Sequence, residues 1–212
     1  MDRTMVITGK GKVSANPDLA IIRLPVENYN MRYSNAVKEL NSIVNQLRKA
    51  LVQLGIEKEN IKTRDFKVDN VAEYDKVRKA KIIKGYNAQH DLVLEIPLHN
   101  KLINQIINKV SEIDETIAIQ INFSVREKEE YLQRLLQNAF EEAKKKASII
   151  AESSGISLKE IVNINYSFSD IYFISETSAD YNSIRYDQDY SADLNPKDID
   201  MSENVTITWR IE

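Results

Sequence analysis

The stretch ITGKGKVSANPDLAII, residues 7–22, decides the fold that the sequence predicts. Its two glycines, Gly9 and Gly11, are each followed by a lysine, as in some loops that bind phosphate. A P-loop, however, needs G-x-x-x-x-G-K-S/T before a helix, and a dinucleotide loop needs G-x-G-x-x-G at a helix start. Here the third glycine is missing, and Pro17 leads into a second strand-like segment, so no helix N-terminus can receive a phosphate. We therefore predict that both glycines serve a bulged strand or a close backbone approach.

The same stretch predicts a β-hairpin. Apolar residues alternate with polar ones before the glycines and again over residues 19–28. Between the two segments lies Asn16-Pro17-Asp18, a turn signal, because proline presets φ and aspartate can bond the backbone ahead of it. We expect the two strands to pair through this turn.

The rest of the chain alternates between helical and strand periodicities. Apolar residues at helical spacing predict helices over residues 34–54, 100–113 and 128–154. Ser34 is the expected N-cap of the first helix, and Gly55 and Gly155 are expected to end the first and third. Alternation predicts strands over residues 62–74, 82–97, 117–125, 162–168 and 205–211.

These elements predict an α+β fold. The order from residue 19 to residue 125 is β-α-β-β-α-β, the split arrangement of ferredoxin-like domains. We expect mixed, mostly antiparallel sheets packed against helices, with two strand-helix-strand units and an added long helix. That helix has alanine at every fourth position from Ala139 to Ala151, a smooth ridge that allows close packing on a sheet. Glu142 and Lys146 are expected to pair on its solvent side.

We expect residues 1–212 to form a single domain, with two possible sub-lobes at about residues 1–127 and 128–212. Residues 169–198 are polar, acidic and rich in tyrosine, which predicts a loop. Tyrosine supplies a large amphipathic contact surface at low entropic cost. The candidate protein-contact residues, weighed against a plain surface loop, are therefore Tyr172, Tyr181, Tyr186 and Tyr190.

No catalytic, cofactor or metal site is predicted. The chain has no cysteine, and its two histidines, His90 and His99, do not form a compact ligand spacing. His90 is in phase with buried positions and is expected to be structural, whereas His99 is expected at the surface. The acidic segment departs from a calcium loop, because Ser191 and Ala192 replace a ligand and the turning glycine. Nucleophile elbows are absent from the sequence as well.

Composition excludes several classes of partner. The net charge of −3 argues against nucleic-acid binding, which needs a concentrated positive field. Apolar runs fall well short of the roughly 20 residues that span a bilayer. The first residues lack the pattern of a signal peptide, so we expect a cytoplasmic protein, or a periplasmic or exported one if a leader has been removed.

Four segments together resemble the SIMPL-domain family, formerly a domain of unknown function. They are VITGKGKVSANPDLAII near the N-terminus, GYNAQHDLVLEI, the long helix running into GISLKEIVNI, and the closing strand ENVTITWRI. The resemblance implies an α+β fold without established catalytic residues. It also implies a bacterial protein linked to stress tolerance that can assemble into ring-like oligomers.

The expected function is that of a non-enzymatic, self-assembling protein acting through protein–protein contacts, as a homo-oligomer and with a possible protein partner. The surfaces expected to make these contacts are the sheet edges, the alanine-ridged helix and the acidic segment. One alternative is a small-molecule or ion-binding domain, with a cleft between the two strand-helix-strand units. Another is a peptide adaptor that uses the tyrosine-rich segment.

Overall fold

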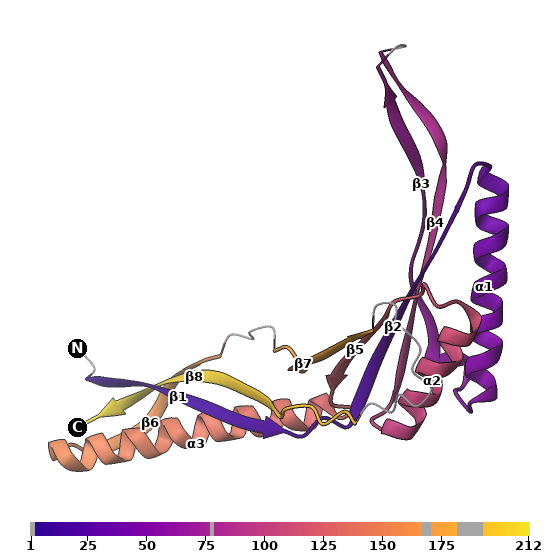
Figure 1. Cartoon of the computed structure of the whole chain (residues 1–212). Coiled ribbons are helices and arrows are strands. Elements are labelled where there is room, and N and C mark those ends of the chain that lie inside the picture. The colour runs from indigo at the N-terminus through magenta and orange to yellow at the C-terminus, as the bar shows by residue number, and fades with distance from the viewer. Residues whose placement is uncertain (1–2, 77–78, 167–170, 182–192) are drawn as a thin grey trace. The chain divides into compact units, whose positions relative to one another are not determined.

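A computed structural model of the chain describes residues 3–76, 79–166, 171–181 and 193–212 (Figure 1). The chain folds into two compact units. The first unit comprises Met1–Pro17, Val125–Ser175 and Lys197–Glu212, and the second comprises Asp18–Ser124 and Glu176–Pro196. The expected sub-lobes divided the chain near residue 127, and the first unit differs from that division because it also contains the N-terminal strand.

The second unit confirms the ferredoxin-like arrangement. Its elements are β2 (Leu19–Asn30), α1 (Tyr33–Gln53), a short 3-10 helix (Lys58–Asn60), β3 (Ile61–Asp75), β4 (Ala80–Pro97), α2 (Asn100–Ile113) and β5 (Ile119–Ser124). They form a sheet in the order β3-β4-β2-β5, to which β7 (Ile174–Tyr181) adds a fifth strand. The pairings of β2 with β4 and β5, and of β3 with β4, are antiparallel.

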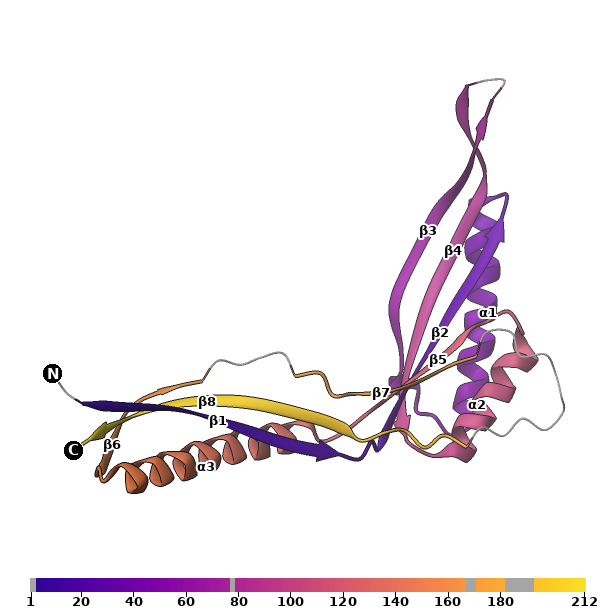
Figure 2. The ribbon, with the colours of Figure 1, turned by 60° about the vertical axis from the view of Figure 1, so that its left-hand side comes forward.

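Alternation along β2 and β4 places the core of the second unit on one sheet face. Ile22, Leu24 and Val26 are fully buried, and they pack with Leu40 and Leu47 of α1. The other face of the sheet carries the intervening residues of β2, which are only partly buried or exposed. Residues 80–85 of β4 pair with β3 and not with β2. Over this stretch β3 and β4 continue as a narrow hairpin (Figure 2).

The first unit is a three-stranded sheet packed on the long helix. Its strands lie in the order β1 (Thr4–Ala15), β8 (Ile199–Ile211) and β6 (Leu158–Asn165). The helix α3 (Lys128–Ser154) runs along β1 and β8 in both ribbon views (Figures 1 and 2). The register of β1 with β8 is unbroken from Thr4↔Arg210 to Ala15↔Ile199. The buried face of α3 is the predicted alanine ridge together with Leu135.

The glycines of β1 are sites of close backbone approach. A Cβ added to Gly9 would lie 2.0 Å from the carbonyl oxygen of Ala139, and one added to Gly11 would lie 2.0 Å from that of Leu135. Any side chain at these positions would overlap the α3 backbone. The predicted close approach is therefore confirmed, whereas the predicted bulge is wrong, because the register with β8 shows no shift.

The predicted hairpin is also wrong. β1 pairs with β8, while β2 is hydrogen-bonded on both sides, by β4 and β5. The Asp18 N–H donates to the Ser124 carbonyl, and the Asp18 carbonyl accepts from the Leu98 N–H. The turn signal at Pro17-Asp18 therefore marks the boundary between the two units, where the chain leaves one sheet and enters another.

Two predicted helix ends are confirmed and one predicted helix start is not. Gly55 and Gly155 have φ of +89° and +65°, the left-handed conformation that ends a helix at little cost for glycine. Ser34, the predicted N-cap, lies inside α1, whose N-cap is Arg32. The side chain of Asn30 accepts the Arg32 N–H at 3.0 Å and so fixes the turn before the helix.

Two further predictions need correction. Apolar spacing along α3 also predicts Leu136 and Ile150 as part of its buried stripe, but they are 39% and 42% exposed. Part of the predicted acidic loop is the strand β7, which joins the five-stranded sheet. Its alternation was hidden because small and polar residues fill most of its positions.

The close contact of β1 with α3 predicts a large cost for Gly11→Ala. The added methyl group must displace helix backbone, and overpacking of this kind typically destabilises by about 1–3 kcal/mol. Urea unfolding of the variant measures the loss in free energy of unfolding. Lys12→Ala, at an exposed neighbouring position of the same strand, is the matched control and should stay within about 0.5 kcal/mol of the wild type. Equal stability of the two variants would contradict the proposed contact.

Candidate functional site

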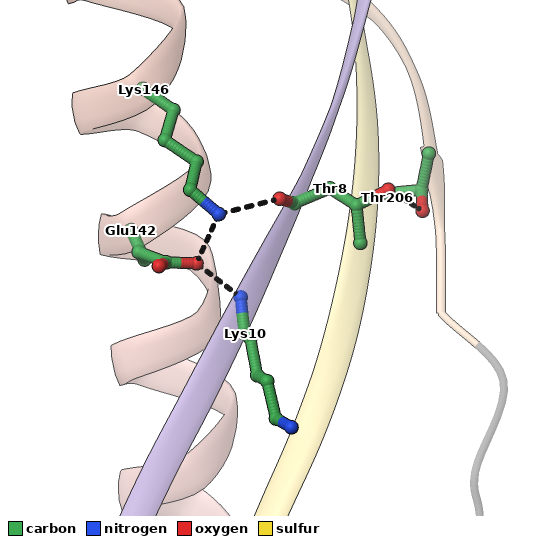
Figure 3. A network of polar contacts seen from close by, with 5 residues as sticks. All are labelled: Thr8, Lys10, Glu142, Lys146 and Thr206. Carbon is green, nitrogen blue, oxygen red and sulfur yellow. Dashed lines mark hydrogen bonds and ion pairs between the residues drawn. The ribbon is translucent and has the colours of Figure 1, made fainter.

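The outer edge of β1 is covered by polar side chains of α3 (Figure 3). Glu142 accepts a hydrogen bond from the backbone N–H of Lys10, and Lys146 Nζ donates to the carbonyl of Thr8 at 3.3 Å. Asn138 Nδ2 donates to the carbonyl of Lys12 at 3.0 Å. These side chains take the place of a neighbouring strand, so the backbone groups that they bind cannot pair with another chain.

Glu142 and Lys146 form the predicted ion pair, with 3.0 Å between Lys146 Nζ and the Glu142 carboxylate. The pair lies against β1 instead of facing only solvent. The hydrogen bond from the Lys10 N–H, and then that from Lys146, lower the pKa of Glu142 below its usual 4.5. The carboxylate is therefore held in its charged form, the form that accepts both hydrogen bonds.

The opposite edge of the same sheet is formed by β6, which is exposed over almost its whole length. Ile161, Val162 and Ile164 are 40%, 52% and 51% exposed. Its two charged residues are already paired within the chain, Lys159 with Glu212 at 2.7 Å and Glu160 with Arg210 at 2.7 Å. An aliphatic edge strand with its charges neutralised is typical of a surface that pairs with another strand.

His90 lies on the helix-covered face of the second unit, as predicted. It is opposite the fully buried Val26, its Nε2 is 2.8 Å from Thr63 Oγ1, and its ring meets Phe66 edge-on. Burial, and then the nearby Arg48 guanidinium, lower the pKa of His90, although Asp91 opposes this. The neutral ring is favoured, which suits a structural histidine. His99 is exposed at the N-cap of α2, also as predicted.

The structure does not bring the candidate tyrosines into one described site. Tyr172 is 75% exposed in the first unit, and Tyr181 ends β7 in the second. Tyr186 and Tyr190 lie outside the described residues, as do Asp187 and Asp189, the acidic residues that invite comparison with a calcium loop. Asp193, a third acidic residue of the same segment, accepts a hydrogen bond from Asn100 at 2.9 Å. The protein-contact role of these tyrosines stays a prediction.

Within the described part of the chain, no three acidic or histidine side chains converge as a metal site. None of the described helices combines the length and the apolar character that crossing a bilayer requires.

Comparison with known proteins identifies the family. The SIMPL family model, described as a protein of unknown function (DUF541), matches residues 5–209. The chain belongs to the SIMPL family. Among curated proteins, none matches it significantly. A solved structure to which this SIMPL protein is similar is that of an uncharacterized conserved protein from Listeria innocua. The two are 8% identical, the match covers 96% of this chain and 92% of the other, and the TM-score is 0.18.

Sequence reasoning missed two features of this SIMPL protein, the contact of Glu142 with β1 and the burial of Asp91. The contact of Glu142 with Lys10 joins residues 132 positions apart, and periodicity within a helix cannot report such a contact. Asp91 had a readable signal, since it is a charged residue directly before the apolar run LVL within a predicted strand. Charged residues are rarely buried unless paired, so an aspartate inside a core strand indicates a special environment.

The covered edge of β1 predicts a pH-dependent contribution of Glu142 to stability. Because its pKa is lowered in the folded state, the contribution is present above the unfolded value near 4.5 and is lost as the pH falls through the folded value. Urea unfolding should therefore find Glu142→Gln less stable than the wild type at pH 7, with the gap closing in acid. Glu141→Gln, at the neighbouring exposed position, is the control and should show no such closing gap. A gap for Glu142→Gln that is constant with pH would rule out this role of the carboxylate.

Proposed function

We propose that this SIMPL protein acts without catalysis, by self-association through the open edge of β6. The observation that carries the proposal is the exposure of Ile161, Val162 and Ile164 on an edge strand. Burying aliphatic side chains contributes roughly 25 cal/mol per Å² of apolar surface, so these residues favour a partner that covers them. Backbone N–H and C=O groups along such an edge supply the directional part of the contact.

A second copy of the chain is the partner that fits this edge. Two copies of β6 can pair antiparallel about a two-fold axis through Val162, so that the same patch is used on both sides. This register sets Glu160 opposite Ile164 and Lys159 opposite Asn165, with no like charges facing each other. The internal pairing of Lys159 and Glu160 with Glu212 and Arg210 reduces the charge repulsion that commonly protects edges.

The biological role and the location that we propose follow from the family resemblance. A role in bacterial stress tolerance would be exerted by the assembled form, in the cytoplasm or, with a leader removed, in the periplasm. Tyr172, one of the candidate contact tyrosines, is 75% exposed and is available to contact a different protein.

The proposal predicts that Val162→Lys weakens self-association. A lysine ammonium at the centre of the paired edge must be desolvated or displaced, and we expect at least about a tenfold weaker association constant. Light scattering coupled to size-exclusion chromatography, over a series of protein concentrations, measures the association.

Val6→Lys is the matched control. Val6 is 59% exposed on β1, the opposite edge strand of the same sheet, next to the backbone that α3 covers. This variant should assemble as the wild type does. A wild-type protein that remains monomeric at every concentration, or a Val162→Lys variant that assembles normally, would refute the proposal.

A further inference from the structure

The face of the second unit's sheet that lies away from the helices contains a small polar cavity. It has a volume of about 140 Å³ and opens between β2, β3 and β4. Charged and amide side chains line most of it, namely Arg23, Glu27, Asp65, Lys67, Gln89 and Asp91. Self-association through β6 does not involve this site, since β6 belongs to the first unit.

Asp91 is the buried anchor of the cavity, with 6% of its surface exposed. Its Oδ2 accepts a hydrogen bond from Arg23 Nε at 2.6 Å, and Arg23 also donates to Gln120 at 3.3 Å. Its Oδ1 is buried and has no hydrogen-bond donor among the residues that the structure describes. A buried acceptor without a donor has a free-energy cost, which is larger when the group is charged. A donor from outside the chain would remove that cost.

The register adds a second reason for a cationic donor. Asp65 of β3 lies directly opposite Asp91 of β4, and like charges in that position repel. The lining contains two cationic side chains against three carboxylates, so its net charge is negative. Arg23 is committed to Asp91, and Lys67 pairs with Asp69 at 3.4 Å. A cation between the two carboxylates would be attracted by both.

The remaining carboxylate of the lining has its own partners. Glu27 accepts hydrogen bonds from Asn87 at 3.1 Å and Gln89 at 2.9 Å, so amides already hold both of its oxygens. The cavity thus offers an unpaired buried oxygen on Asp91 and an exposed carboxylate on Asp65. Within the described residues this is too few convergent ligands for a metal ion.

We infer that this cavity binds the primary ammonium group of an alkylamine. An ammonium is compact, carries three N–H donors and one positive charge, and can therefore bond the Asp91 Oδ1 and the Asp65 carboxylate together. Pro25, which also lines the cavity, offers an apolar contact to the alkyl stem. The same chemistry is presented by a free diamine and by a lysine side chain of another protein.

Calorimetric titration of the full chain with n-butylammonium chloride tests the site. Tetramethylammonium chloride, which has the charge but no N–H donor, is the control ligand at matched ionic strength. We expect saturable binding of n-butylammonium only. Asp91→Asn should weaken it by at least about tenfold, the effect of losing one charge-assisted hydrogen bond. Glu95→Gln, an exposed carboxylate on the same strand outside the cavity, should leave binding unchanged.

A second variant guards against misfolding of Asp91→Asn. Asp65→Asn alters an exposed side chain and should weaken binding while circular dichroism shows an intact fold. Two further ligands distinguish the two possible carriers of the ammonium group, a free diamine and a lysine side chain. Tighter binding of 1,4-diaminobutane than of n-butylammonium supports a free diamine, and tighter binding of Nα-acetyl-lysine N-methylamide supports a lysine side chain.

Three results would overturn the inference. They are the absence of saturable binding by any of the amines, equal binding of tetramethylammonium, and unchanged binding in both carboxylate variants.

Discussion

The first unit depends on the absence of two side chains. Because Gly9 and Gly11 have no Cβ, the backbone of α3 can approach β1 to a distance that any other residue would prevent. Glycine within a strand is destabilising by roughly 0.5–1 kcal/mol relative to alanine, so the contact must compensate for it. The alanine ridge of α3 is the other half of the same arrangement, since larger side chains would hold the two elements apart. Short side chains such as Asn138 reach the strand backbone only because of this proximity.

A consequence of the close contact is that the sheet's two edges differ. The edge at β1 has several of its backbone groups occupied by side chains of α3, whereas the edge at β6 is exposed and aliphatic. A sheet with two open edges can add strands without limit and grow into fibres, but a sheet with one open edge is closed once a single pair has formed. In the proposed assembly, the polar side chains of α3 would therefore limit growth as well as support the fold.

Local patterns predicted most of the elements of this SIMPL protein and little of their pairing. The boundaries of α2 and α3 followed from apolar spacing and from Gly155, because these signals are local. The partner of β1 did not follow, because Pro17-Asp18 is compatible with a hairpin and with a passage between sheets. Register with a strand at the far end of the chain leaves no trace in the local sequence.

The two candidate surfaces, the β6 edge and the cavity at Asp91, were likewise only partly predictable from the sequence. Exposure of β6 could not be inferred from its alternating aliphatic residues, which resemble those of a buried strand. The unusual position of Asp91 could be suspected from the apolar run that follows it, but the opposed Asp65 depends on a register that contains a shift between Thr63 and Asp65. What sequence reasoning lacked in both cases was the identity of the neighbouring strand.

The pairing of β1 with β8 also determines the order in which the chain can fold during synthesis. Thr4 is opposite Arg210, so β1 has no partner until β8, far along the chain, has been made. The ferredoxin-like order of the second unit is continuous from Asp18 to Ser124, and it can form on the ribosome while the chain is still growing. In that interval the apolar residues of β1 have no β8 to pair with. Synthesis of this protein thus includes a late, long-range closure step, which is the kind of step that slows folding and exposes a nascent chain to chaperones and to misassociation.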